Sequence, residues 1–360
     1  MAFRSTPSER GVKLELLVDD KPVSSLILFD LRMGIGGVPL RCGGIGGVST
    51  PRAQRMHGYS RRVLAHSVEV MRAEGYEIAA LFGIPDYYHR FGFASALVEG
   101  EIVLATRDAE LAVARYPVRE FEPADARAIA ELYVAHCAVR NGYIVRDPET
   151  WTGIAKGAGW SDRVGTYVAL DGDRVVGYAS YTLDARRFGL GEVVAVNASI
   201  YSTLLAEAAR RAIAFRVERI PVQLPPDDPF CRPCRRYGAE IKVTYARCAG
   251  GMVRLIDQTA VLHKLQPLLA GRLAASPLAD WQGSLVLETE LGSGTLTFGN
   301  AGRAVRARIP QGTLTQLLLG YRDVADVAFE GDLEAEDAAV PLLDALFPSG
   351  YPYVWMADRF

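Results

Sequence analysis

One order of elements occurs twice in this chain, and the repeat limits the folds open to it more than any other feature. The first copy reads as a strand, a helix, a buried strand that ends in proline and the sequence HRFGF, at 37–49, 61–76, 77–85 and 89–93. The second copy has the same order and ends in RRYGA, at 192–197, 202–216, 219–226 and 235–239. Gly92 and Gly238 are 146 residues apart, and Val48 and Val196, which end the first strands, are 148 apart. Such matched spacing indicates two copies of one α/β unit.

The composition is that of a globular chain with more than one domain. A chain of 360 residues is too long for one ordinary hydrophobic core. With 49% hydrophobic and 23% charged residues the composition is that of a globular protein, and disorder is predicted only for the first ten residues. A net charge of -2 gives no basic face for nucleic acid. No apolar run approaches the roughly 18 residues that span a bilayer, and the start lacks a secretory signal. Five cysteines, an odd number, argue against a disulfide framework, so a cytoplasmic protein without a membrane span is expected.

The segments outside the repeat also have readable patterns. Hairpins are predicted around the turns DDKP at 19–22 and DGD at 171–173. A different region begins near Gly250: a strand and a helix are followed by a meander of three short strands and by two helices, at 252–257, 259–273, 284–290, 294–300, 304–310, 313–322 and 338–347. The aromatic segment at the end is expected to dock against the protein. The predicted fold class is α/β (α+β).

The junction between the first repeated strand and its helix carries Arg55, Gly58 and Ser60. A helix start presents backbone N–H groups without intrahelical partners and the positive end of the macrodipole, so it can hold phosphate oxygens. A glycine lets the backbone approach such a group closely, and an arginine adds a cation. The chain lacks both the GxxxxGK[ST] loop and the GxGxxG spacing. The junction is therefore predicted to be an anion cradle of another kind.

Two motifs, in order and separated by a helix and a strand, resemble the GNAT acyltransferases: Arg55-x-x-Gly58-x-Ser60, where Gly or Ala is usual at the last position, and Tyr88-x-x-Phe-Gly-Phe. The resemblance implies acetyl-CoA as a substrate and no metal. It implies that the cofactor-binding residues are Val48, Ser49, Thr50, Arg55, Met56, His57, Gly58, Tyr59 and Ser60. Tyr88 would protonate the leaving thiolate, since a phenol with a pKa near 10 can act as general acid for a thiol near 8.5. The alternative is that Tyr88 is an ordinary packed tyrosine.

The whole layout resembles the Eis-like branch of this superfamily. That branch implies two tandem GNAT-type mixed-sheet domains followed by a sterol-carrier-like α+β domain, here at 1–110, 111–250 and 251–360. It implies that the terminal carboxylate, here on Phe360, lies in the active site of the first domain and helps to deprotonate the acceptor amine there. It also implies a small-molecule amine acceptor, such as an aminoglycoside or a polyamine-like molecule, and a homo-oligomer of the hexamer type.

The second copy has lost the motif residues. The segment VNASIYSTLLAEA contains no glycine where Gly58 would recur, and CRPC at 231–234 stands in place of the tyrosine motif. CRPC is read as a decayed copy, with a metal or redox site as the alternative. Only about ten polar residues come before the hairpin, too few for the strand and two helices that precede it in this family. Either the start of the chain is placed too late, or the first domain is expected to lack that segment. A catalytically impaired CoA- or lipid-binding protein therefore remains the alternative function.

Overall fold

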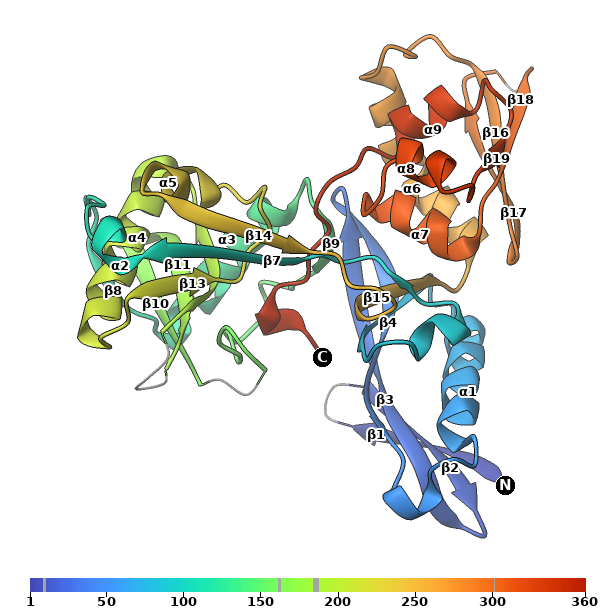
Figure 1. Cartoon of the computed structure of the whole chain (residues 1–360), viewed down its shortest axis with the longest axis horizontal. Coiled ribbons are helices and arrows are strands. Elements are labelled where there is room, and N and C mark those ends of the chain that lie inside the picture. Colours follow the sequence, from blue (N-terminus) through green and yellow to red (C-terminus); the bar gives the residue numbers. More distant parts are fainter. Residues whose placement is uncertain (9–10, 161–162, 184–187, 301) are drawn as a thin grey trace. The chain divides into compact units, whose positions relative to one another are not determined.

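The computed structural model describes residues 1–8, 11–160, 163–183, 188–300 and 302–360. The chain divides into two compact units, both of which mix helices with β-sheet (Figure 1). The first unit contains residues 1–97, 246–352 and 360, and the second contains 98–245 and 353–359. The predicted α/β (α+β) class is thereby confirmed. Among the described residues, no helix has the length and apolar character needed to cross a membrane.

The first sheet of the first unit is mixed and has the strand order β1-β2-β3-β4-β5-β15-β6. Its strands are β1 (Ala2–Ser8), β2 (Gly11–Val18), β3 (Lys21–Ile35), β4 (Val38–Ser49), β5 (Ile78–Gly83), β6 (Ala94–Ser95) and β15 (Gly250–Leu255). β2 and β3 form the predicted hairpin, and its turn residues Asp19 and Asp20 have φ of 49° and 58°. β4 and β5 are parallel, and helix α1 (Tyr59–Ala73) connects them.

The first residues require a correction. We expected disorder before Gly11, yet β1 pairs antiparallel with β2, from Ala2 opposite Leu17 to Ser8 opposite Gly11. This polar segment has no hydrophobic periodicity, and its order comes from backbone pairing and from an Arg4–Glu15 ion pair of 2.7 Å, in which the Glu15 side chain is buried. A strand therefore precedes the hairpin, while the described residues ahead of β2 contain no helix.

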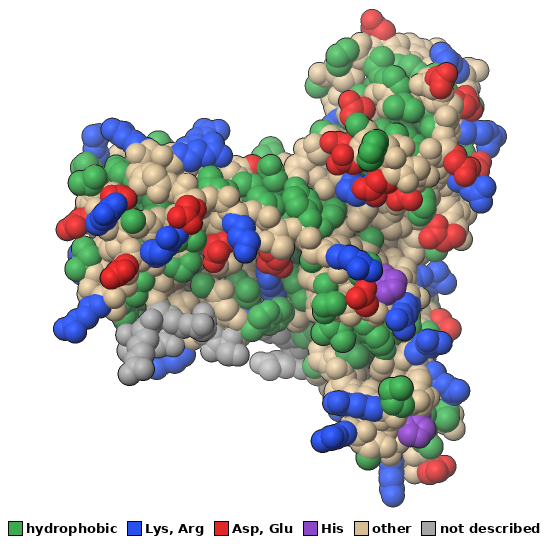
Figure 2. All heavy atoms as spheres, viewed as in Figure 1, with side chains coloured by type: hydrophobic (Ala, Val, Ile, Leu, Met, Phe, Trp, Pro, Cys, Tyr) green, Lys and Arg blue, Asp and Glu red, His purple; other side chains and the backbone are tan. Residues whose placement is uncertain are grey.

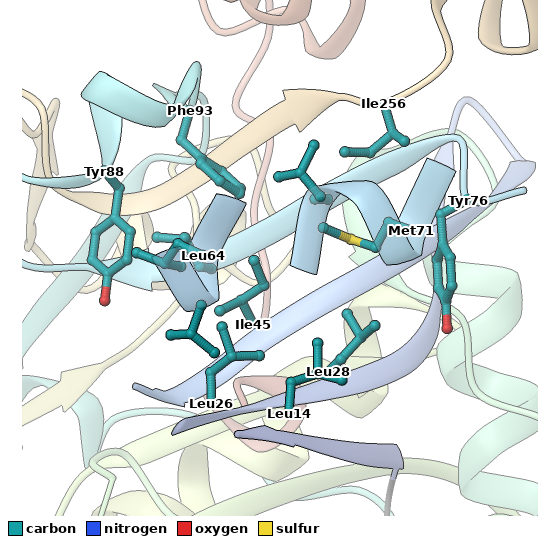
Figure 3. Packing of buried hydrophobic residues seen from close by; sticks show 14 of the residues in the cluster. Leu14, Leu26, Leu28, Ile45, Leu64, Met71, Tyr76, Tyr88, Phe93 and Ile256 are labelled. Carbon is teal, nitrogen blue, oxygen red and sulfur yellow. The ribbon is translucent and has the colours of Figure 1, made fainter. Parts of the chain in front are cut away.

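Helix α1 packs on this sheet through the residues that the sequence pattern predicts. Val63, Leu64, Val68 and Met71 are all buried, and they join a cluster with side chains of β2–β5. Figure 3 shows Tyr88 and Phe93 at the end of this cluster near Leu64, with Tyr76 at the opposite end. The cluster thus anchors both ends of α1.

Neither the first sheet nor the sheet of the second unit is built from one continuous stretch of the sequence. β15, which the sequence analysis assigns to the third region, pairs antiparallel with β5 and β6 of the first sheet. β7 (Glu99–Ala105) pairs with two strands of the second unit, β13 (Arg219–Val222) and β14 (Ala239–Thr244). The chain therefore passes between the sheets at 97–98 and 245–246, whereas the sequence suggested boundaries at 110 and 250.

Residues 256–352 of the first unit form a third group of elements, with a four-stranded sheet of order β17-β16-β18-β19. The elements are α6 (Gln258–Ala274), β16 (Gly283–Thr289), β17 (Gly292–Phe298), β18 (Ala304–Arg308), α7 (Gln311–Leu319), α8 (Val324–Phe329), β19 (Glu334–Ala335) and α9 (Val340–Leu346). The predicted meander is wrong, because β18 is parallel to β16. The backbone at Arg303 closely approaches the start of β16 at Gly283, where a Cβ atom would lie 2.4 Å from the carbonyl oxygen of Arg303.

The second unit contains a seven-stranded sheet of order β14-β7-β13-β12-β11-β10-β8. The other strands of this sheet are β8 (Val118–Glu120), β10 (Val164–Asp171), β11 (Arg174–Thr182) and β12 (Leu190–Ala195). The helices of the unit are α2 (Thr106–Ala109), α3 (Ala126–Cys137), α4 (Ala198–Ala214) and α5 (Cys231–Arg236), and the short strand β9 (Asn141–Ile144) does not belong to this sheet. β10 and β11 form the predicted hairpin. Parallel β12 and β13 are joined by α4, as β4 and β5 are joined by α1, which confirms the predicted repeat.

The aromatic segment near the end docks as predicted. Within the second unit Trp355 is fully buried, with its ring centroid 5.5 Å from that of Tyr133. The buried Arg146 guanidinium lies between the carboxylates of Glu192 and Asp358, at 2.7 and 2.9 Å. This segment is therefore held by packing and by paired charge.

Candidate active site

The start of α1 is an uncapped helix end. Its N-cap, Gly58, has φ of 74° and supplies no side-chain acceptor, and an added Cβ would have no atom within 4 Å. The first intrahelical bond, from Arg62 N to Gly58 O, measures 3.2 Å. The amides before Arg62 therefore point out of the helix with the positive end of the dipole behind them. Met56 also has a positive φ, 65°, a conformation that a non-glycine residue adopts at a cost.

A cavity of about 740 Å³ opens onto this helix start. Its lining includes every residue predicted to bind the cofactor, together with Tyr88: Val48, Ser49, Thr50, Arg55, Met56, His57, Gly58, Tyr59 and Ser60. Arg61 and Arg62 also line it, although the sequence analysis did not single them out, and no Asp or Glu is among the lining residues. Figure 2 shows blue Lys and Arg side chains on this part of the surface, where Figure 1 draws the start of α1. The cavity is therefore suited to an anion.

The pairing between β4 and β5 ends beside this cavity. They pair from Cys42 opposite Ile78 to Ile45 opposite Leu81, and each strand then continues, to Ser49 and Gly83. On its other side, β4 has a register shift against β3 between Gly46 and Ser49. Within the described residues, the last part of β4 therefore has backbone groups on the β5 side that β5 does not pair. A ligand with amide groups could add to this strand edge.

Tyr88 opens the 3₁₀ turn η2 (Tyr88–Phe91) and is 8% exposed. A Cβ on Gly83 would lie 2.6 Å from Cδ2 of the Tyr88 ring, so the glycine makes room for this ring. Burial raises the pKa of the Tyr88 phenol, and the neighbouring Tyr87 raises it further. The Tyr87 hydroxyl shares a hydrogen bond with Ser60 Oγ, which ties the tyrosine turn to the start of α1. A protonated phenol thus stands at the edge of the cavity.

Phe360 lies within the first unit against β3, β4 and β5. Its ring centroid is 5.7 Å from those of Phe29 and Phe82. Glycines make this possible, because a Cβ on Gly44 would lie 2.8 Å from the Phe360 ring, and one on Gly46 would lie 3.2 Å from its carbonyl carbon.

The two predicted catalytic residues lie on opposite faces of the sheet. Gly43 faces Met71 of α1, whereas Gly44, the next residue of β4, faces Phe360. Tyr88 belongs to the cluster on the α1 side. The parting of β4 and β5 opens the sheet between these faces, so a group placed there could be approached from both.

The equivalent junction in the second unit is closed. The N-cap of α4, Asn197, accepts hydrogen bonds from Ser199 N and Ile200 N through its side chain, at 3.0 and 3.1 Å. A cavity of about 530 Å³ lies beside it and is lined by Val194–Ala198, by residues of α3 and α4, and by Pro229, Arg232 and Pro233 at the start of α5. The amides that could hold an anion therefore already have an acceptor.

The CRPC motif has the properties of packed structure. Cys231 and Cys234 are buried free thiols on the short helix α5, and Cys231 Sγ contacts the carbonyl oxygen of Pro225 at 3.4 Å. Burial raises the pKa of Cys231 to about 12, and it raises that of Cys234 as well. A buried thiol with a raised pKa is a poor nucleophile at neutral pH.

Sequence reasoning missed one cluster of metal-ligating groups. The ligand atoms of Asp86, His89 and Cys248 lie within 4.8 Å of one another, beside the tyrosine turn. The Asp86 N–H donates to the carbonyl oxygen of Cys248, at 3.1 Å, and Arg247 approaches the Asp86 carboxylate at 4.0 Å. The residues are 162 apart at most in sequence, so no local spacing signals the cluster.

Two protein-family models match parts of this chain. Residues 7–96 match the acetyltransferase (GNAT) domain family, and residues 277–355 match the sterol carrier protein domain family. A search of curated proteins found no match.

Among solved structures, a probable N-acyltransferase from Enterococcus faecalis V583 has a TM-score of 0.76 at 16% identity, covering 98% of this chain and 89% of that chain. A GCN5-related N-acetyltransferase from Kribbella flavida has a TM-score of 0.72 at 19% identity, covering 97% and 87%. Eis1 from Mycobacterium abscessus has a TM-score of 0.68 at 16% identity, covering 97% and 90%. At these identities the likeness shows a shared fold.

Proposed function

The chain carries a GNAT acetyltransferase domain followed by a sterol carrier protein domain, and on this basis we propose that it is an acetyl-CoA-dependent N-acetyltransferase. Its acceptor is a primary amine of a small molecule, with aminoglycosides and polyamine-like molecules as the first candidates from the family resemblance. The observation that carries the proposal is the uncapped start of α1 inside a cavity lined by arginines and without acids.

The cavity supplies what each part of acetyl-CoA requires. The free amides at Gly58 and in the first turn of α1 would hold the pyrophosphate, with the Arg55 side chain as an added cation. The backbone of β4 near Val48 and Ser49 would pair with the pantetheine amides, since β5 leaves that edge unpaired. The acetyl group would then lie where β4 and β5 part, within reach of Tyr88 on the α1 side.

The reaction is acyl transfer with one proton moved at each end. The Phe360 carboxylate takes a proton from the amine through water, and the amine nitrogen attacks the thioester carbonyl carbon. The C–S bond then breaks, and Tyr88 gives its phenolic proton to the leaving thiolate. The products are the acetylated amine and CoA with a free thiol. The raised pKa of the Tyr88 phenol keeps it protonated at neutral pH, as a general acid must be.

The test is isothermal titration of acetyl-CoA into the whole chain and into Gly58→Glu. A glutamate at this position places a side chain and a negative charge in the cradle, so we expect affinity to fall at least about 100-fold. Gly172→Glu is the matched control, because Gly172 also has a positive φ, 59°, and open space, but lies in the β10–β11 turn of the second unit. It should bind acetyl-CoA like the wild type.

Turnover is then measured as release of free CoA thiol with a panel of primary amines. If Gly58→Glu still binds acetyl-CoA like the wild type, the start of α1 is not the pyrophosphate site. A chain that binds acetyl-CoA through the cradle but acetylates no amine would instead favour the catalytically impaired CoA-binding protein that the sequence left as the alternative.

A further inference from the structure

The segment that follows Tyr88 is held by two side chains of the sterol carrier domain and by one side chain of β15. η2 is a single 3₁₀ turn of four residues, and an isolated turn of this length does not fix its own conformation. Inside the turn, the N–H groups of Gly92 and Phe93 donate back to the carbonyl oxygens of His89 and Tyr88, at 3.0 and 3.4 Å. The position of Tyr88 therefore depends on what holds the peptide groups at 91–95, in addition to the packing of its own ring in the cluster and the Tyr87–Ser60 hydrogen bond.

Three side chains donate to carbonyl oxygens of this segment. Gln311 Nε2, at the start of α7, donates to Gly92 O at 3.1 Å. Gln316 Nε2, one turn later on α7, donates to Ser95 O at 2.8 Å. Arg254 Nη1, on β15, donates to Phe91 O. The three donors, here called the carbonyl clamp, hold the segment on both sides of Phe93.

Gln311 is itself rigidly placed. It is 4% exposed, its backbone N–H donates to Glu290 Oε2 at 2.9 Å, and its carbonyl oxygen accepts from Thr315 Oγ1 at 2.7 Å. Its donor thus reaches Gly92 from a fixed point in the sterol carrier domain. Because a buried amide that loses its hydrogen-bond partner costs free energy, this contact resists displacement of the turn.

The clamp also explains the glycine in the tyrosine motif. A Cβ on Gly92 would lie 2.1 Å from Gln311 Nε2 and 3.4 Å from the Arg254 guanidinium carbon, and Gly92 has φ of 77°. The absent side chain leaves the space that the two donors occupy. Both donors thus reach the backbone of this segment through the space that a side chain at position 92 would fill.

We propose that Gln311, with Gln316 and Arg254, is a positioning residue for Tyr88, so that the sterol carrier domain aligns the general acid of the acetyltransferase domain. This inference rests on the proposed function. Gln311 does not line the acetyl-CoA cavity, and it acts only through the peptide groups of Gly92 and Phe93. Its loss should therefore reduce kcat and leave acetyl-CoA binding intact.

The test is Gln311→Met, which keeps length and removes the donor, compared with Gln266→Met. Gln266 lies on α6 and donates its Nε2 to Thr297 O at 2.9 Å, a bond of similar length at a more exposed position away from the tyrosine turn. We expect Gln311→Met to lower kcat about 10-fold with KM for acetyl-CoA within about twofold, and Gln266→Met to change neither. If Gln311→Met fails to fold, the half-buried Gln316→Met replaces it with the same expectation.

A double-mutant cycle separates positioning from general destabilisation. If Gln311 acts through Tyr88, Gln311→Met should change kcat less than about twofold in the Tyr88→Phe background. An equal loss in both backgrounds, or a kcat unchanged by Gln311→Met in an active enzyme, would overturn this inference alone. A wild type that binds acetyl-CoA and acetylates no amine would overturn the proposed function, and this inference with it.

Discussion

The two strand-to-helix junctions of the repeat have the same fold and opposite chemistry. At the start of α1, Gly58 leaves the helix amides uncapped and facing a cavity, whereas at the start of α4 the Asn197 side chain accepts two of them. Both helices bury an apolar face and connect two parallel strands. The difference teaches that the α/β unit packs in the same way whether its helix start is open or capped, since packing uses the apolar face of the helix and capping uses the first backbone N–H groups.

The largest effect that this comparison predicts is in catalysis. Tyr88→Phe should lower kcat about 100-fold, because the leaving thiolate loses its proton donor, while acetyl-CoA affinity stays within about twofold. The matched variant is Tyr201→Phe, since Tyr201 lines the corresponding cavity of the second unit. Steady-state kinetics with the best amine of the panel measures both. Equal losses in the two variants would contradict the assignment of catalysis to the first unit.

A smaller effect is expected in binding. Arg55→Ala removes one cation from the α1 cavity and should weaken acetyl-CoA binding about 10-fold, whereas Arg232→Ala, in the cavity beside α4, should have no effect. Titration calorimetry measures the two dissociation constants at one salt concentration, since a charge contact weakens as salt rises. A second binding event that disappears in Arg232→Ala would show that the α4 junction still binds the cofactor.

Local patterns predicted the surroundings of the candidate site. Helical spacing predicted α1, and the cofactor-binding residues that the family resemblance implies all line one cavity at its start. Their role in binding stays a prediction. These features lie within a few residues of one another, so they can be predicted from local sequence patterns.

The features that the sequence did not reveal depend on distant partners. The Gln311 contact with Gly92 joins residues 219 apart, and no spacing rule connects them. β15 was recognised as a strand, yet its place between β5 and β6 depends on which sheet edge is free. β1 has a polar sequence, and its order comes from pairing with β2, which a periodicity argument does not detect.

The cap of α4 predicts an effect on stability alone. Asn197→Ala leaves two amides at this helix start without their acceptor and should lower the free energy of unfolding by about 1 kcal/mol. Chemical denaturation followed by circular dichroism measures it, and acetyl-CoA affinity should be unchanged. Ser199→Ala is the control, because the contact there is made by the Ser199 backbone N–H and persists in the variant. A loss of acetyl-CoA binding in Asn197→Ala would break the contrast between the two junctions.

The smallest effect expected is the response of the first site to alkaline pH. Burial raises the pKa of the Tyr88 phenol above its ordinary value of 10, and a general acid works only while protonated. Raising the pH from 8 to 9.5 should therefore leave this acid in place, and kcat at saturating substrates should change less than about twofold. The control is Tyr88→Phe, which retains no phenol to titrate at this position. A fall in kcat below pH 9 that is present in the wild type and absent from Tyr88→Phe would mean that the phenol ionises below its ordinary pKa. That result would contradict a buried, uncharged acid at the edge of the α1 cavity.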